Sequence, residues 1–160
     1  MARIMNMDRI MNPRPVSIVA DVDLERGLFV EIKGMAENNI WLAGEDDFEA
    51  YEVALATATT KIGDLLIHST VPKLYDERLV EADFVLEAGK VGRGHYVTVG
   101  DEITIAADLI DEDVNVEVGT ELALDAGGML TEVAEGGTAL AKVVKIYNWN
   151  GQDSVMIRFV

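Results

Sequence analysis

Apolar and polar residues alternate with a period of two along much of the chain, which is typical of β-strands with one buried face. The alternation is clear in residues 27–34, 95–107 and 114–124. Glycines punctuate these stretches, and the glycine pairs at 127–128 and 136–137 indicate tight turns or loops. The pattern predicts an all-β fold, mainly an antiparallel sheet or a barrel, with little helix.

Two hairpins are predicted in the last 40 residues. In residues 122–133, two leucines precede a turn through Asp125 to Gly128, and apolar residues follow it. The final hairpin turns at Asn150-Gly151, a pair that readily adopts the positive φ angles of tight turns. Its returning strand ends the chain on apolar residues, so we expect that strand to fill the core. Burial of each large apolar side chain there contributes roughly 1.5–3 kcal/mol.

Several segments fit more than one structure. Residues 45–63 fit either a strand or a short helix, and residues 69–84 resemble a loop with one helical turn. The glycine-rich residues 89–95 are interpreted as a turn, with anion binding as the alternative. Trp149 lies at the tip of the final hairpin, where an indole either folds back on the sheet or contacts a partner. A half-buried strand is expected to place three valines on one face, namely Val114, Val116 and Val118.

Residues 1–14 are predicted to form an extended, flexible arm, and residues 15–160 a β-rich globular domain. Pro13 and Pro15 disfavour helical geometry at the residues before them. The chain of 160 residues has a net charge of −16, whereas the arm alone carries +2 and the remainder −18. Such an acidic body repels phosphate, so we expect no nucleic-acid partner.

The composition narrows the setting further. The chain has no cysteine, which excludes disulfides and thiolate metal sites. No apolar run approaches the roughly 18 residues of a membrane span, and the N-terminus lacks the uninterrupted apolar stretch of a signal peptide. We therefore expect a soluble protein made in the cytoplasm, with no membrane partner.

No catalytic, cofactor or metal site is predicted. His68 and His95 have no histidine or cysteine near them in sequence, and no serine lies in a G-x-S-x-G elbow. Residues 111–115 have the alternate spacing of an EF-hand loop, but Val116 and Leu122 occupy the positions that need glycine and a bidentate glutamate. The Asp111–Asp113 segment is thus expected to be a solvated loop, with weak binding of a divalent ion as the alternative.

The pattern of turns and strands over residues 62–160 resembles the capsid decoration (cement, or head-stabilisation) proteins of tailed bacteriophages. The similar motifs are an aromatic segment near "YDE", then "F-x-L-x-A-G", "V-G-D-x-I-T-I", a "V-G-x-x-L-x-L" hairpin and a final "K-V-V-x-I" strand. The residues that carry the resemblance are Phe84, Leu86, Ala88, Gly89, Gly100, Asp101, Ile103, Gly119, Leu122, Leu124, Gly128, Lys142, Val143 and Ile146.

This resemblance implies a structural protein without enzymatic activity that binds the outer face of the capsid lattice and stabilises the head. Its implied partners are the major capsid protein and further copies of itself, as a homotrimer, in the virion. An extended arm can bind a neighbour by strand addition. The arm residues expected to contact the capsid are Arg3, Ile4, Met5, Arg9, Ile10, Met11 and Arg14, and Trp149 is a further candidate.

Two other functions remain open from the sequence. One is another virion component, such as a head-completion or tail protein. The other is a small β-fold hydrolase that depends on a metal, although the ordered motif of such an enzyme is missing. For the decoration function, we expect removal of residues 1–14 to weaken attachment and to leave the melting temperature nearly unchanged.

Overall fold

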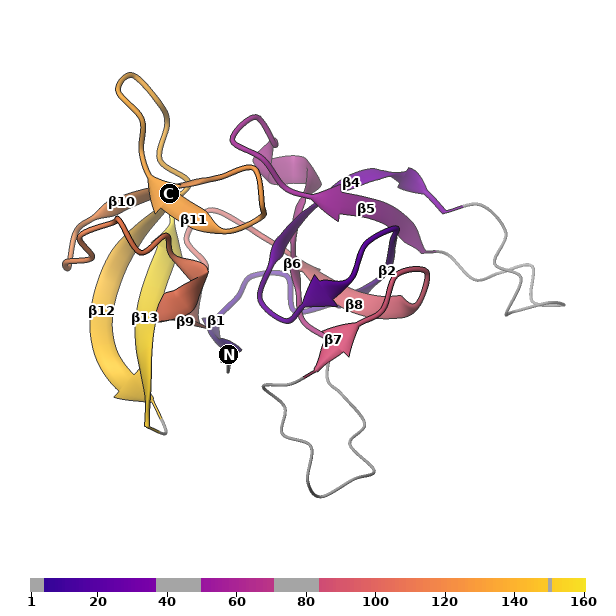
Figure 1. Ribbon diagram of the computed structural model, residues 1–160, viewed down its shortest axis with the longest axis horizontal. Coiled ribbons are helices and arrows are strands. Elements are labelled where there is room, and N and C mark those ends of the chain that lie inside the picture. The colour runs from indigo at the N-terminus through magenta and orange to yellow at the C-terminus, as the bar shows by residue number, and fades with distance from the viewer. Residues whose placement is uncertain (1–4, 37–49, 71–83, 150) are drawn as a thin grey trace, which may run out of the picture.

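The computed structural model describes residues 5–36, 50–70, 84–149 and 151–160. In these ranges the chain is built almost entirely of β-strands, which form a closed barrel, a six-stranded sheet and a short ribbon (Figure 1). The prediction of an all-β fold is confirmed, and both of the forms that the sequence left open, sheet and barrel, are present. None of the helices in the described ranges is long and apolar enough to cross a membrane.

The barrel is formed by five strands in the closed order β2-β5-β4-β6-β8. All its neighbouring strands are antiparallel except β2 and β5, which run parallel. The ribbon pairs β3 with β7 beside the barrel. The strands of these two units are β2 (Val16–Ala20), β3 (Leu24–Glu25), β4 (Phe29–Met35), β5 (Tyr51–Leu55), β6 (Leu65–His68), β7 (Val85–Leu86) and β8 (Val91–Tyr96).

The six-stranded sheet has the order β1-β9-β13-β12-β10-β11, and all of its neighbouring strands are antiparallel. Both predicted hairpins are confirmed, as β10–β11 and as β12–β13. The strands of the sheet are β1 (Met5–Arg9), β9 (Glu102–Ala106), β10 (Glu121–Leu124), β11 (Leu130–Glu132), β12 (Ala141–Trp149) and β13 (Gln152–Phe159). Short 3₁₀ turns, η2 (Ile62–Asp64) and η4 (Ala107–Leu109), lie before β6 and after β9.

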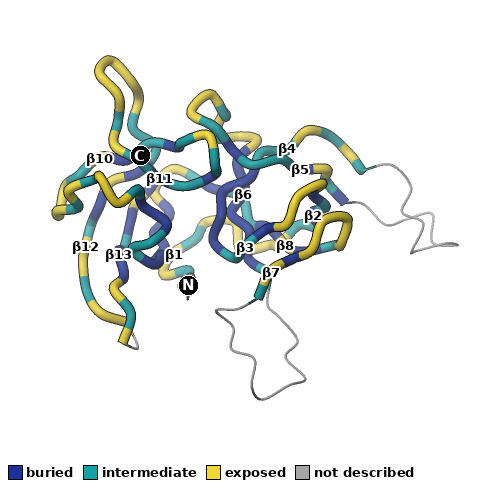
Figure 2. Tube along the Cα trace, in the orientation of Figure 1, coloured by how far each residue is buried: buried dark blue, intermediate teal, exposed yellow. Residues whose placement is uncertain are grey.

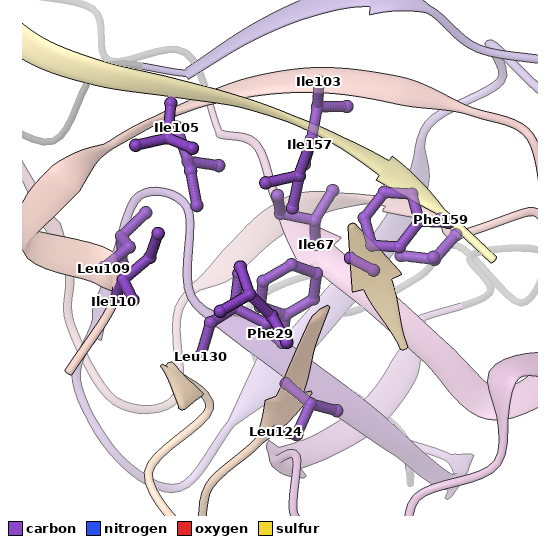
Figure 3. Close-up of a cluster of buried hydrophobic side chains, with 14 of the residues drawn as sticks. Phe29, Ile67, Ile103, Ile105, Leu109, Ile110, Leu124, Leu130, Ile157 and Phe159 are labelled. Atoms are coloured by element: carbon purple, nitrogen blue, oxygen red, sulfur yellow. The ribbon is translucent and has the colours of Figure 1, made fainter. Parts of the chain in front are cut away.

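The main core lies where one face of this sheet packs against the outside of the barrel (Figures 2 and 3). Phe159 of the last strand contacts Phe29 of the barrel edge to face, with ring centroids 6.0 Å apart and an interplanar angle of 78°. Ile157 and Phe159 are 0% and 2% exposed, so the apolar chain end fills the core as expected. We call this face of the sheet the inner face and the opposite one the outer face.

A second, smaller core fills the barrel interior. Gly92 and Gly94 lie inside strand β8, so the interpretation of residues 89–95 as a turn is wrong beyond Lys90. A Cβ at Gly92 would collide with Leu86, and one at Gly94 would lie only 3.3 Å from the Ile18 side chain. These glycines therefore allow close packing in a narrow barrel, which explains why glycine occurs within a strand.

The structure confirms one of the predictions for segments that fit more than one structure and contradicts another. Residues 51–55 are strand β5, which confirms the strand alternative for that part of residues 45–63. The expected strand with three aligned valines is wrong, because residues 112–118 form turns and irregular backbone. Val114 N donates to Asp111 O at 3.0 Å, which turns the chain there, and Val118 is 68% exposed. The predicted helical turn in residues 69–84 lies mostly outside the described residues.

Candidate functional site

The N-terminal segment lies along one edge of the six-stranded sheet. Strand β1 pairs antiparallel with β9, from Met5 opposite Ile105 to Arg9 opposite Glu102. Met7 and Ile10 are partly buried and pack against the main core. Extended conformation was expected for this segment, whereas its pairing with the body of the same chain was not.

The candidate arm residues differ in their surroundings. Arg3 and Ile4 lie outside the described residues, and Met5 is placed only by its backbone pairing. Met11 is 70% exposed and Arg14 is also exposed. The Arg9 side chain is 80% exposed, so Arg9, Met11 and Arg14 are accessible to a partner, whereas Ile10 is partly buried against the main core.

Two hydrogen bonds hold the chain between β1 and β2 against the body. Met11 N donates to Asp101 Oδ1 at 2.8 Å. The His95 ring is hydrogen-bonded to the Pro13 backbone, and His95 Nδ1 lies 2.5 Å from Ser69 Oγ. These contacts fix where the segment leaves the barrel, so the exposed side chains of Met11 and Arg14 have defined positions.

A row of charged residues crosses the outer face of the sheet. Directly opposite residues of neighbouring strands share a face, and the register aligns Glu121, Lys142, Arg158, Glu102 and Arg9 in this order. Glu102 has a side chain only 8% exposed and is paired with two arginines: Arg158 Nε donates to Glu102 Oε1 at 2.8 Å, and Arg9 Nε lies 3.7 Å from Oε2. The row connects the N-terminal strand to the last strand.

A second group of polar contacts lies beside this row. Thr104 is fully buried, and its hydroxyl donates to Asp8 Oδ2 at 2.7 Å and lies 2.7 Å from the Tyr147 hydroxyl. Lys145 Nζ lies 4.7 Å from the centre of the Tyr147 ring, a cation–π distance. The outer face is therefore ordered by hydrogen bonds and carries lysine and tyrosine at its margin.

Trp149 lies at the end of β12, at the tip of the final hairpin. Its ring meets that of Tyr147 edge to face, with centroids 6.1 Å apart, and the residue remains 37% exposed. The indole thus folds back in part onto its own hairpin. The exposed remainder leaves partner contact as a prediction.

In the described ranges, the Ser69–His95 pair invites comparison with a nucleophilic enzyme. Ser69 is only 5% exposed, and the His95 ring is also bonded to the Pro13 backbone, where a catalytic histidine would meet an orienting carboxylate. Burial lowers the pKa of His95, while the Pro13 hydrogen bond opposes this shift. The neutral ring can accept the serine proton in a hydrogen bond, so the pair is well suited to tie the segment before β2 to the barrel.

Two surface hollows have room for a small ligand. One, of about 260 Å³, is lined mainly by apolar residues near the chain end, including Leu140 and Val160. The other, of about 580 Å³, is polar and lined by Glu117, Glu121 and Glu132. No cluster of three or more potential metal ligands occurs in the described ranges. In the acidic loop, Asp111 Oδ1 instead accepts a hydrogen bond from Asp113 N at 3.0 Å.

Acidification is expected to destabilise the fold through His68. This residue is fully buried, and its Nδ1 lies 2.8 Å from Glu25 O while Nε2 lies 2.7 Å from Thr70 Oγ1. Burial lowers its pKa, the hydrogen bond to Glu25 opposes the shift, and the charge of Arg26 adds to it. In the unfolded chain the pKa of a histidine is about 6.5.

The unfolded chain protonates His68 more readily than the folded chain does. The stability that depends on neutral His68 is therefore complete above about pH 6.5 and is lost as the pH falls below it. Chemical denaturation at pH 7.5, 6.5 and 5.5 measures the loss. The His68→Asn variant is expected to show a shallower decline over this range. Equal slopes for both proteins would contradict the role of His68.

The charged row and the Asp8–Thr104–Tyr147 contacts were missed from the sequence. Both depend on the pairing of β1 with β9, which joins residues more than 90 positions apart along the chain, and on the pairing of β9 with β13. One signal was available. Residues 94–141, a stretch of 48, contain no lysine or arginine, and the basic residues Lys142, Lys145 and Arg158 all follow it. Their concentration in the last hairpin indicates a charged surface there.

Comparison with known proteins shows a similarity in structure, without a match to a family model or a curated protein. Among solved structures, the chain is similar to the N base of the head fiber gp8.5 of bacteriophage phi29, with a TM-score of 0.45, 12% sequence identity and coverage of 98% of each chain. The description as a head fiber base belongs to that phi29 protein.

Proposed function

We propose that this chain is a structural protein of a bacteriophage virion that binds the outer surface of the capsid and stabilises the head. The proposal rests first on the resemblance over residues 62–160, several of whose motif residues in the described ranges have definite places in the fold. Gly100 and Gly119 have positive φ angles, Leu122 and Leu124 fill the core, and Val143 is buried beside them. These positions support a shared architecture, and the function follows from the family that the motifs resemble.

The proposed binding surface is the N-terminal segment, and the geometry of this segment is the main support for it. It is extended, it is anchored at Asp101 and His95, and it presents Arg9, Met11 and Arg14 outward. A segment held in place loses less conformational entropy on docking than a disordered one. We propose that this segment contacts the major capsid protein, and that repetition over the lattice strengthens attachment through self-association as a trimer.

No enzymatic step is part of this proposal. In the described part of the chain, the buried Ser69–His95 pair and the two hollows do not bring a nucleophile, a base and a space for substrate together. A head-completion or tail protein remains the second candidate. The number of copies per purified particle separates the two, because decoration requires hundreds of copies and a connector only a few.

Changing the exposed residues of the segment is expected to weaken capsid binding without loss of stability. Deletion of residues 1–14 is a poor test, because Met7 and Ile10 pack in the core and their removal should now lower the melting temperature. The double variant Met11→Ser/Arg14→Glu removes exposed apolar surface and reverses one charge. We expect at least about a tenfold loss of affinity for empty capsids that lack this protein.

Co-sedimentation with such capsids over a range of protein concentrations measures this affinity. Lys90→Glu makes the same reversal of charge at an exposed turn between β7 and β8 and serves as the control. It should bind like the wild type, and all three proteins should melt within about 2 °C of one another. Equal binding by the double variant would exclude the N-terminal segment as the capsid contact.

A further inference from the structure

Strand β12 has an uncovered edge along its second half. Strand β13 pairs with it from Ala141 to Trp149, with a bulge at Val144, whereas β10 pairs with only its first two residues. A hydrogen bond from Val143 N to Thr120 O, at 2.9 Å, extends this coverage by one residue. Beyond that point, no strand within the described ranges pairs with the second edge of residues 144–149 (Figure 1).

The chemistry of this edge favours contact with another strand. Unpaired backbone groups on an edge strand are a template for strand addition, and residues 144–149 contain no proline to block it. Ile146 is an apolar side chain that is 47% exposed beyond the core, and the tip of the hairpin is among the exposed parts of the sheet (Figure 2). No acidic residue occurs from Ala141 to Gln152, although the chain as a whole carries −16. The repulsion between acidic side chains of two copies is therefore weak at this edge.

We propose that this edge binds the same edge of a second copy, as an antiparallel pair of β12 strands related by a two-fold axis through Ile146. Each Ile146 then covers its counterpart. On the outer face, Lys145 of one copy lies opposite Tyr147 of the other. Within one chain these two side chains already form a cation–π contact of 4.7 Å, and the pair between copies has the same chemistry. The surface is thus complementary to itself, as a two-fold contact requires.

Three observations set the register of the β12 pair: the face on which each side chain lies, the repulsion between lysines, and the length of the free edge. A shift by one residue would set inner-face side chains against outer-face ones. An axis through Lys145 would place two lysines directly opposite each other, which is destabilising. An axis through Tyr147 would leave Ile146 facing Asn148. The axis through Ile146 also stops the pairing at residues 144 and 148, just before the segment that leads into β10 covers the edge at Val143.

This contact needs no capsid, so its test is independent of the proposed function, and it joins two chains whether or not each belongs to a trimer. Five residues on each side form less surface than the roughly 1,200 Å² of a stable interface. We therefore expect a weak, concentration-dependent association. A covalent trap is the appropriate measurement.

The natural chain contains no cysteine, so a single introduced thiol reports one contact. Opposite residues of an antiparallel pair have Cα atoms about 4.5–5.5 Å apart, within the about 4.4–6.8 Å that a disulfide spans. Ile146→Cys, oxidised mildly at about 200 µM, is expected to form disulfide dimers at least about tenfold faster than Val118→Cys, a control at a 68% exposed position. Unchanged melting temperatures before oxidation establish that both variants are folded.

A mixed reaction tests the register. Lys145→Cys is combined with a size-tagged Tyr147→Cys, and the mixed dimer is expected to form faster than either symmetric dimer. Equal rates for Ile146→Cys and Val118→Cys would overturn the proposal and leave the edge to a strand of another protein. Faster coupling within Lys145→Cys alone would overturn the two-fold axis through Ile146.

Discussion

Replacement of Phe159 by alanine is expected to lower the free energy of unfolding by about 3–5 kcal/mol, the usual cost of removing a buried phenylalanine ring. The side chain is 2% exposed and stands between the sheet and the barrel, in edge-to-face contact with Phe29 (Figure 3). Its removal opens a cavity at the junction of the two units. Urea denaturation followed by circular dichroism measures the change.

Val118→Ala is the matched control, since it removes methyl groups from a side chain that is 68% exposed and should change stability by less than about 0.5 kcal/mol. A double-mutant cycle of Phe29→Leu and Phe159→Leu isolates the ring pair, with an expected coupling of about 0.5–1.5 kcal/mol. A loss below about 1 kcal/mol for Phe159→Ala would mean that this ring does not join the sheet to the barrel.

Gly128→Ala is expected to cost about 3 kcal/mol, for two additive reasons. Gly128 has φ +71°, a conformation that L-residues with a side chain rarely adopt. An added Cβ would also lie far inside van der Waals contact with the carbonyl oxygen of Phe29. At this point the β10–β11 turn touches the barrel, because Phe29 N donates to Gly128 O at 2.9 Å.

Gly89→Ala separates the two causes. Gly89 has nearly the same φ, +76°, but open space where its Cβ would be, so only the backbone strain of about 1 kcal/mol applies. The excess loss in Gly128→Ala measures the collision with the barrel. If the two variants lost the same stability in thermal and urea unfolding, the close approach of hairpin and barrel would be refuted.

The hairpins were predictable because their turns are encoded locally. Asp125 Oδ1 accepts hydrogen bonds from Gly127 N and Met129 N, and Asn148 Oδ1 accepts one from Gly151 N. Side chains of this kind stabilise turns from within the segment itself. An alternating apolar pattern on either side of such a turn was then enough to define a pair of strands.

The division into barrel and sheet was not predictable, because it depends on pairings between distant segments. Strand β1 pairs with β9 across about 96 positions, and β2 runs parallel to β5. The alternation with a period of two also predicted a strand that does not form, in a segment where local hydrogen bonds stabilise turns. Glu117 N donates to Thr120 Oγ1 at 3.0 Å, and Val114, Val116 and Val118 lie on turns and irregular backbone and not on a strand.

The candidate site was predicted only in part. Exposure of Met11 and Arg14 agrees with a contact role, whereas the partial burial of Ile10 against the main core reduces its accessibility. The charged row from Glu121 to Arg9 has members in five strands, and its alignment exists only once the sheet is assembled. Periodicity within one strand gives the face of each residue, but not its neighbours on other strands.

The order of the strands has a consequence for biosynthesis. All five barrel strands come from residues 16–96, so the ribosome completes the barrel before it begins strand β9. The sheet requires the final residues, because β9 lies between β1 at the start of the chain and β13 at its end. Until β13 has left the ribosome, the growing chain exposes Phe29 and Ile67 to solvent, and in that interval it is most susceptible to chaperone capture and aggregation.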